Sequence, residues 1–353
     1  MLLKVNRSSL SGLLILLMSS LFGAVSCDDG VKPIVLYVSA DEYVARPLVK
    51  RFSERTGIPV HLVGDTEATK TTGLVDRLRA ERHRPMADVF WSSEAMLTIA
   101  LAEENLLHPH ASEAVMNWPE LWRDANRLWY GFSPRPRVLV SDPAVLGEDL
   151  VPRSLQDLCD SKWKGRIVMA DPRFGTTGGH LAALRVWHES NGRSEDFNHW
   201  LACLGENDIR ILPGGNAAVV DEVRSGRALI GLTDADDVRA ANRLGAGLVM
   251  HPVGPVAQAG TFLMPNTVAL IKGRQHPHAG QLVDFLLSDE VAVALAESTS
   301  GNIPLQPEVA AQFPELVVPD PMQVDLSTTA AQYQLAVGEA IRILSQDTPD
   351  VAP

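Results

Sequence analysis

The chain has 353 residues, of which 43 are acidic and 31 are basic, and its formal net charge is −12 at pH 7. This charge argues against nucleic acid as a partner, because no basic field is present to displace the counterions of the phosphates. The length exceeds one typical hydrophobic core and predicts two domains or lobes, and three cysteines are too few for a cysteine-rich metal site.

Residues 1–26 are typical of a bacterial secretory signal. Lys4 and Arg7 precede an apolar stretch, 10–24, that is too short and too rich in serine for a membrane span. The run AVSC, which ends at Cys27, resembles a lipobox and predicts acylation of that cysteine. An ordinary signal peptide with an incidental cysteine is the alternative. Two or three acyl chains make a stable lipid anchor. The tether, residues 27–33, would then hold a periplasmic or cell-surface folded domain close to a membrane.

Short apolar runs alternate with segments of helical period along the rest of the chain. The predicted strands are 34–38, 59–63, 87–90, 137–140, 167–169, 209–212 and 229–232, with a pair of return strands in 260–271. The predicted helices are 43–57, 72–82, 94–106, 178–191, 195–205, 216–225, 235–244, 277–286, 289–298 and 328–345. This order favours an α/β fold with mostly parallel, doubly wound sheets.

The pattern restarts after two prolines near the middle of the chain and predicts two α/β lobes with hinge crossovers. We expect lobe one to comprise 34–135 and about 258–308, lobe two to comprise 136–257 and about 309–345, and 346–353 to be a tail. A hinged cleft between such lobes suits a small solute. An exported body of this size favours the solute-binding component of a transporter, and an exported hydrolase is the competing class.

Two cysteines remain in the body of the chain, Cys159 and Cys203. An exported chain resides in an oxidising compartment, where these residues can form a disulfide. Two buried free thiols are the equally weighted alternative.

Three carboxylates follow the apolar run 228–232, namely Asp234, Asp236 and Asp237. Asp234 precedes a predicted helix, and aspartate is a favoured N-cap. Acidic groups in a first helical turn also complement the helix dipole. Capping explains one aspartate well and a second in part, whereas a third adds repulsion between like charges. We therefore expect Asp236 or Asp237 to contact a solute, with capping or solvation of all three as the alternative.

The segment FGTTGGH, residues 174–180, leads from a predicted strand into a helix. Its backbone N–H groups, including that of Gly178, and the hydroxyls of Thr176 and Thr177 suit an oxyanion at the helix N-terminus. Asn216 opens another helix, and Arg135 or Arg137 can add positive charge near the hinge. A tight turn with an ordinary cap is the alternative for this segment.

Five segments, taken in their order along the chain, carry a resemblance to a known family. They are 35–60, 65–81, the octapeptide ADVFWSSE at 87–94, 162–172 and 280–297. Together they resemble the ferric-ion-binding branch of the type 2 periplasmic binding proteins, from about Val35 to about Pro307. The resemblance implies two lobes joined by crossover strands with the solute between them. It also implies a monomer without enzymatic activity that serves an ABC permease and a separate ATPase subunit.

The metal site of that branch is altered in this chain. A histidine follows the first strand in the best-known ferric binders, and Asp41 stands at that position. Their glutamate corresponds by strict count to Ser93, with Glu94 one residue later. Their pair of adjacent tyrosines is replaced by Asp236 and Asp237. The resemblance therefore makes Asp41, Glu94 and the two aspartates the candidate ligands.

The favoured cargo is a hard metal ion, foremost Fe³⁺, accompanied by an oxyanion. In the ferric binders a phosphate- or carbonate-like anion occupies the turn that matches Thr176, Thr177 and Gly178. Carboxylates alone suit Mn²⁺, Ca²⁺ or Mg²⁺ equally well. The alternative cargo is a small zwitterion such as an aminoalkylphosphonate, with its ammonium on Asp236 or Asp237 and its phosphonate on the threonines. No resident cofactor is expected, and no GxSxG or Cys–His pattern indicates catalysis.

Overall fold

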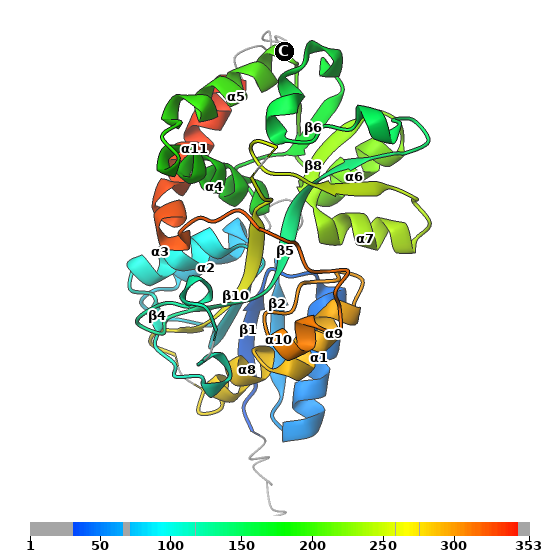
Figure 1. Cartoon of the computed structure of the whole chain (residues 1–353). Coiled ribbons are helices and arrows are strands. Elements are labelled where there is room, and N and C mark those ends of the chain that lie inside the picture. The colour runs from blue at the N-terminus through cyan, green and yellow to red at the C-terminus, as the bar shows by residue number, and fades with distance from the viewer. Residues whose placement is uncertain (1–30, 66–70, 117, 258, 275, 345–353) are drawn as a thin grey trace, which may run out of the picture. The chain divides into compact units, whose positions relative to one another are not determined.

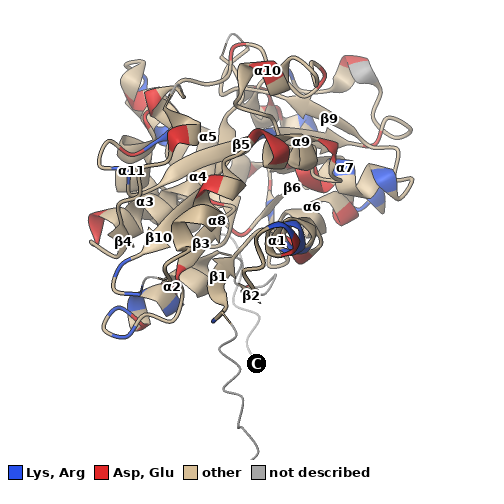
Figure 2. Cartoon of the chain, turned by 90° about the horizontal axis from the view of Figure 1, so that it is seen from below, with Lys and Arg blue, Asp and Glu red and all other residues tan. Residues whose placement is uncertain are grey.

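The computed structural model describes residues 31–65, 71–116, 118–257, 259–274 and 276–344. The part of the chain from Pro33 onward forms one compact unit. The predicted signal, Cys27 and the predicted tail lie outside the described residues. Among the residues that the structure describes, no helix is long and apolar enough to cross a membrane. Acidic and basic positions are interspersed over the helices and loops visible in Figure 2, as the mixed charge of the sequence suggests.

The first lobe begins with three parallel strands, each followed by a helix (Figure 1). The strands are β1 (Ile34–Val38), β2 (Val60–Gly64) and β3 (Val89–Ser92), and the helices are α1 (Glu42–Thr56), α2 (Thr72–Ala80) and α3 (Ala95–Glu103). The strands are short because their apolar runs are short, and nearly every residue of β1 and β3 is buried. Gly57 ends α1 in the left-handed conformation, with φ of 71°.

Two long strands connect the lobes. Strand β5 (Tyr130–Ser141) pairs antiparallel with β10 (Leu263–Ile271) through its first seven residues. Its last five residues, Arg137–Ser141, pair with β8 (Ile230–Asp234) and β9 (Val249–Pro252). The ten strands therefore follow the order β2-β1-β3-β10-β5-β8-β6-β7, with β4 (Leu107–His108) on β10 and β9 on β5. Because β5 belongs to both halves, its side chains reach the junction between the lobes.

The second lobe repeats the parallel arrangement. Strand β6 (Ile167–Ala170) lies parallel to both β7 (Arg210–Leu212) and β8. Its helices are α4 (Thr176–Ser190), α5 (Ser194–Glu206), α6 (Gly215–Arg224) and α7 (Ala235–Arg243). Cys159 and Cys203 form a disulfide with 5.3 Å between their Cα atoms, so the structure favours the bonded alternative.

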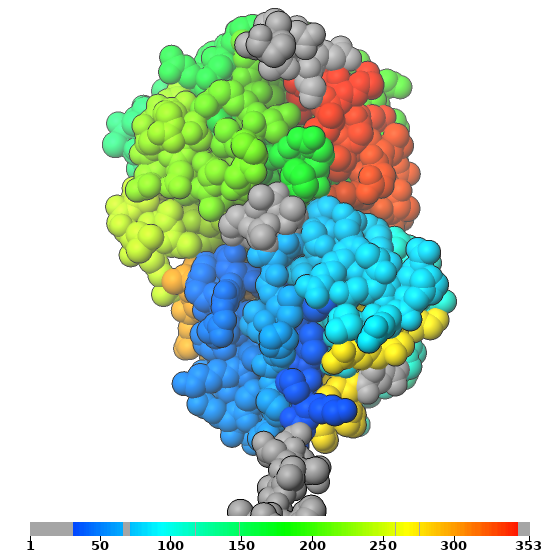
Figure 3. Space-filling model, turned by 180° about the vertical axis from the view of Figure 1, so that it is seen from behind, coloured from blue at the N-terminus to red at the C-terminus, as the bar shows by residue number. Residues whose placement is uncertain are grey.

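The remaining helices return to both lobes. Helices α8 (Ala279–Leu286), α9 (Asp289–Glu297) and α10 (Pro307–Ala310) follow β10, and α11 (Leu326–Leu344) closes the described chain. Helix α11 packs on α4 and α5 of the second lobe and on α3 of the first. In Figure 3 its red surface lies beside the green surface of the second lobe and the cyan surface of the first. Within the described residues, 3₁₀ turns lie in the connections at Glu113–Val115, Glu120–Trp122, Glu148–Leu150, Leu155–Cys159 and Ser161–Trp163.

The predicted α/β fold class is confirmed, and two details of the prediction need correction. The run 260–271 forms one strand, β10, rather than a pair. A Cβ on Gly260 would lie 1.7 Å from the carbonyl oxygen of Asp320, so this residue lies tightly against another loop and not in a ladder. Strands β4 and β9 and the short helix α10 were not predicted. The proposed lobe boundaries stay a prediction.

Candidate functional site

A small cavity of about 50 Å³ lies at the junction of the two lobes. The first lobe lines it with residues that follow β1 and β3, and the second lobe with residues that follow β6 and β8. The polar lining residues are Ser39, Asp41, Ser93, Arg135, Asp171, Thr176, Thr177, Asn216, Asp234, Asp236, Asp237, Asn266, Ser300 and Asn302. A buried water needs about 10–15 Å³, so the cavity has room for an ion and a small anion. Carboxyl ends of parallel strands are where α/β sheets commonly bind ligands.

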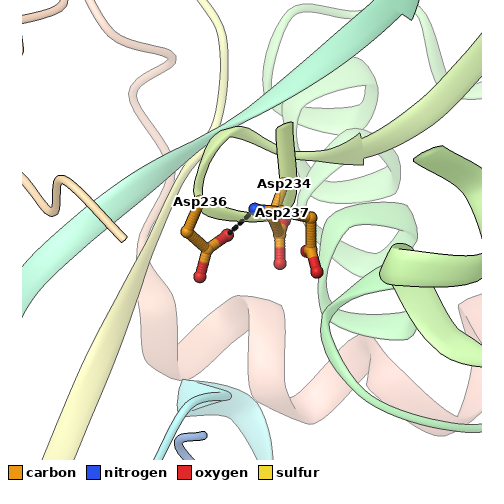
Figure 4. Close-up of side chains that lie close together, drawn as sticks. All are labelled: Asp234, Asp236 and Asp237. Atoms are coloured by element: carbon orange, nitrogen blue, oxygen red, sulfur yellow. Dashed lines mark hydrogen bonds between the residues drawn. The ribbon is translucent and has the colours of Figure 1, made fainter. Parts of the chain in front are cut away.

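Three aspartates gather at the start of α7. One carboxylate oxygen from each of Asp234, Asp236 and Asp237 lies within 4.8 Å of the others. In Figure 4 the three carboxylates point to the same side of the loop, and the backbone N–H of Asp237 donates to Oδ1 of Asp236 at 3.2 Å. The three residues lie together because β8 ends at Asp234 and the next turn carries the other two.

Asp234 is the buried member of the cluster, with 1% of its surface exposed. Its Oδ1 accepts from Nη1 of Arg137 at 2.7 Å. Its Oδ2 accepts from the Thr176 hydroxyl at 2.7 Å, the Asn216 amide at 3.0 Å and Nε of Arg135 at 3.3 Å. Burial alone would raise the pKa of this carboxyl, but the two guanidiniums lower it to about 2.

These contacts decide between the two interpretations of Asp234. It stands at the N-cap position of α7, yet its carboxylate makes no cap hydrogen bond. Both oxygens instead hold residues of β5, α4 and α6 around the cavity. Asp234 is therefore a positioning group that joins three elements, and its oxygens are already occupied by protein donors.

Arg135 links the cluster to the first lobe. Its Nε lies 3.1 Å from the Asp236 carboxylate, and its Nη2 donates to the carbonyl oxygen of Ser93 at 2.8 Å. Although burial acts to lower it, the pKa of Arg135 is raised by the surrounding carboxylates, foremost those of Asp236 and Asp234. This guanidinium is 4% exposed and stays charged. It offsets part of the acidic charge and fixes the carboxylate of Asp236 toward the junction.

The first lobe contributes Asp41 and a group of hydroxyls. Thr71 donates to Oγ of Ser39 at 2.9 Å, and the backbone N–H of Ser93 donates to the same oxygen at 2.8 Å. Thr71 has φ of 64°, which is unusual for a branched residue and is held by this buried contact. Tyr43 lies in the first turn of α1, and burial and then the charge of Asp41 raise its pKa to about 12.

The predicted anion turn forms the N-terminus of α4 and faces the cavity. Gly175 precedes the helix with φ of 62°, and as a glycine it has no side chain to cap the first backbone N–H groups. The Thr176 hydroxyl is engaged with Asp234, whereas the buried Oγ1 of Thr177 makes no hydrogen bond with the residues described. Thr177 also lines the cavity, so its hydroxyl and the helix N-terminus form the side of the cavity that suits an oxyanion.

Three predicted site residues lie behind the cavity wall. Both oxygens of Glu94 accept backbone N–H groups of α3, at 2.9 and 2.8 Å, while its neighbour Ser93 lines the cavity. Burial raises the pKa of Glu94 to about 7. Arg137 holds Asp234, Thr176 and Asn216 through its Nη1. A Cβ on Gly178 would lie 2.6 Å from the Tyr333 hydroxyl, so this glycine serves the packing of α4 on α11.

The sequence prediction did not single out Ser39 or Asp171. Each follows the end of a parallel strand, β1 or β6, and each lines the cavity. Their position directly after an apolar run is the signal that could have identified them. Asp171 holds Arg173 through Nε at 2.9 Å, so this carboxylate and this guanidinium form a pair at the cavity edge.

The comparisons with known proteins agree on a family. Residues 84–319 match the family model described as bacterial extracellular solute-binding protein. Iron uptake protein A1 of Synechocystis sp. is 25% identical over 300 residues, which cover 78% of each chain. The Fe(3+)-binding periplasmic protein of Serratia marcescens is 31% identical over 231 residues, 64% of each chain. The crystal structure of iron-bound HitA from Pseudomonas aeruginosa superposes with a TM-score of 0.75 at 24% identity, covering 87% of this chain and 99% of that one.

Proposed function

The chain belongs to the family of bacterial extracellular solute-binding proteins, and we propose that its solute is ferric iron, captured with an oxyanion between the two lobes. The descriptions of both relatives name iron, as does the description of the solved structure that this chain resembles. Fe³⁺ is a small, hard cation and favours anionic oxygen ligands. The carboxylates of Asp41, Asp236 and Asp237, which line one cavity, supply such oxygens.

The observation that carries the proposal is the pairing of opposite chemistries in one small cavity. Carboxylates enter it from both lobes, from Asp41 after β1 and from the start of α7. The N-terminus of α4 and the Thr177 hydroxyl border the same space. A cation bound between the carboxylates would draw the lobes together, and an oxyanion at α4 would complete its ligand shell.

The proposal extends to the transport role of the family. The closed, loaded protein would present both lobes to an ABC permease, and a separate ATPase subunit would supply the energy for transport. We propose a monomer that binds its solute without chemical change. The solute identity, the monomeric state and the absence of catalysis can each be tested on the purified protein.

Export and anchoring form a separate part of the proposal. Residues 1–26 would direct export and would be removed, and Cys27 would carry the acyl chains. Metabolic labelling with a radioactive fatty acid should mark the wild-type chain and leave Cys27→Ser unmarked. Equal labelling of both would refute the anchor without affecting the binding site.

A small zwitterion such as 2-aminoethylphosphonate is the second candidate solute. The observation in its favour is that the cavity separates an acidic side, at Asp236 and Asp237, from an oxyanion side, at Thr177 and α4. An ammonium and a phosphonate on one short chain would meet both sides. Such a ligand needs no metal, and this is the difference that an experiment can detect.

Calorimetric titration of the chelator-stripped protein distinguishes these solutes. Ferric citrate, Mn²⁺ and 2-aminoethylphosphonate are titrated separately into wild type and into Asp236→Ala/Asp237→Ala. We expect tight ferric binding that the double substitution abolishes. Tight phosphonate binding with no response to metal would replace iron by the zwitterion. Failure of all three solutes against wild type would refute the proposed cargo.

A further inference from the structure

The helix that carries the aspartate pair also carries two arginines that contact the first lobe. Arg239 and Arg243 lie four residues apart on α7, and residues at this spacing share one face of a helix. Their guanidiniums donate to backbone carbonyl oxygens of the segment 297–302, which begins at the last residue of α9. Helix α7 therefore presents its first turn to the cavity and binds the first lobe through the turns that follow.

Arg243 binds the C-terminus of α9. Its Nη2 donates to the carbonyl oxygens of Glu297 at 3.0 Å and Ser298 at 2.7 Å. Carbonyls in the last turn of a helix lack partners within that helix, and the negative end of the helix dipole attracts a cation. Helix α9 has no basic residue in its own last turn, so Arg243 supplies this cation from the second lobe.

Arg239 contacts the same segment closer to the cavity. Its Nη1 donates to the carbonyl oxygen of Gly301 and lies 3.5 Å from that of Ser300. Gly301 has φ of 55°, and a Cβ there would lie 2.8 Å from Cδ of Arg239, so the stem of the arginine needs a glycine at this position. Ser300 and Asn302, on either side of the glycine, line the cavity. Arg239 therefore fixes a part of the cavity wall that belongs to the first lobe.

The charge of Arg239 also links it to the aspartate pair. Burial lowers the pKa of this guanidinium, whereas the carboxylates of Asp236 and then Glu315 oppose the shift. Asp236 lies 3.1 Å from Nε of Arg135 as well. The carboxylate of Asp236 thus interacts with two guanidiniums, and Arg239 is the one whose hydrogen bonds reach the segment 297–302.

From these contacts we propose that Arg239 and Arg243 are positioning residues that hold α7 against the first lobe and so slow the release of the solute. This proposal rests on the proposed function and names residues that regulate the same site. With α7 held in place, the carboxylates of Asp236 and Asp237 stay beside Asp41, with which they line the cavity. Opening of the lobes by a hinge motion must break the contacts of both arginines. Their loss should therefore act on the dissociation rate far more than on the association rate.

Release kinetics test this role. Iron-loaded wild type, Arg239→Gln/Arg243→Gln and Arg153→Gln/Arg193→Gln are mixed with excess chelator, and tryptophan fluorescence, to which Trp91 in the cavity wall contributes, reports the release. The last variant is the matched control, because it removes two exposed arginines of the second lobe that do not line the cavity. We expect the first variant to release iron at least about ten-fold faster, with an association rate within about two-fold of wild type, and the control to match wild type. Equal release rates of all three proteins would overturn the proposal.

Urea unfolding of the solute-free proteins separates positioning from general support of the fold. The acceptors of both arginines are neutral carbonyl oxygens, so we expect the glutamine variant to keep the unfolding midpoint of wild type. A lowered midpoint with an unchanged release rate would assign the arginines to the fold alone and overturn the proposal. If the double variant does not fold, Arg243→Gln, at an exposed position, replaces it, and release at the wild-type rate would then count against the proposal.

A measurement without solute separates this proposal from the proposed cargo. Spin labels at Lys50→Cys in α1 and Ser190→Cys in α4 report the distance between the lobes by pulsed electron paramagnetic resonance. We expect Arg239→Gln/Arg243→Gln to shift the distances in the solute-free protein to longer values. If wild type retains no iron, the cargo proposal fails and this measurement decides alone, because identical distance distributions with and without the two arginines would overturn their positioning role.

Discussion

Replacing Asp234 by asparagine should destabilise the fold, because this carboxylate is buried between two arginines. The substitution would keep the shape of the side chain but remove the charge that faces Arg137 at 2.7 Å and Arg135 at 3.3 Å. The new amide group would also place donors opposite donors. Removing one partner of a buried ion pair costs about 3–5 kcal/mol, since the remaining charge stays buried without compensation.

The lowered pKa of Asp234 reflects the same contacts with the two arginines. The native surroundings lower it from 3.8 to about 2. At about 1.4 kcal/mol per pKa unit, this shift corresponds to about 2–3 kcal/mol of stability at neutral pH. Because the folded-state pKa is depressed, the contribution is present above the unfolded pKa near 4 and is lost as pH falls toward 2. Both routes give a free-energy change of a few kcal/mol.

Urea unfolding followed by circular dichroism measures this effect. We expect Asp234→Asn to lower the free energy of unfolding at pH 7 by about 3 kcal/mol, and by less at pH 3. Asp236→Asn is the matched control, because its side chain is 22% exposed and its ion pair with Arg135 is therefore partly solvated; its loss should stay below about 1 kcal/mol. Asp234→Asn within about 0.5 kcal/mol of wild type would refute the positioning role.

Three further predictions concern buried groups near the site and the disulfide. Burial raises the pKa of Glu94 from 4.5 to about 7. The preference of the folded state for the protonated side chain therefore adds stability below pH 4.5, and this contribution is lost as pH rises through 7. The melting temperature of Glu94→Gln should rise relative to that of wild type between pH 5 and 8, and parallel pH curves would contradict this prediction. A Cβ on Gly179 would lie 2.5 Å from Oε1 of Glu94, so Gly179→Ala should cost about 1–3 kcal/mol by thermal unfolding, whereas Gly338→Ala, with open space around its Cβ, should cost nothing. Replacing Cys159 and Cys203 together by alanine opens a loop with a sequence separation of 44 and should cost up to about 4 kcal/mol in urea unfolding, and an unchanged midpoint would show that the bond adds no stability.

The helices and most strands were predictable because each carries its own periodicity. The helix predicted at 235–244 is α7, Ala235–Arg243, and the strand predicted at 34–38 is β1 with the same bounds. The strand predicted at 137–140 is part of a longer element, β5. Its first half contains Pro134 and Pro136, which disfavour a strand locally, and pairing with β10 from far along the chain overrides this preference.

The roles of individual acidic residues were less predictable, because they depend on partners distant in sequence. Asp234 has the local pattern of a helix cap, and only the approach of Arg137, 97 residues away, shows that its carboxylate turns elsewhere. Ser93 and Glu94 are neighbours, yet one faces the cavity and the other caps α3. The point where β3 ends and α3 begins decides this, and element boundaries are the least certain part of a sequence prediction.

The most direct test of the account is the ferric affinity of the aspartate pair. Wild type, Asp236→Asn/Asp237→Asn and Asp289→Asn/Glu290→Gln compete for iron with a chelator of known affinity in equilibrium dialysis. The last variant removes two acidic groups from the first turn of α9 and so controls for the loss of charge at a helix N-terminus. We predict at least about 100-fold weaker binding, some 2.7 kcal/mol, for the first pair and an unchanged affinity for the control. Equal affinity of all three proteins would contradict the claim that these aspartates hold the iron.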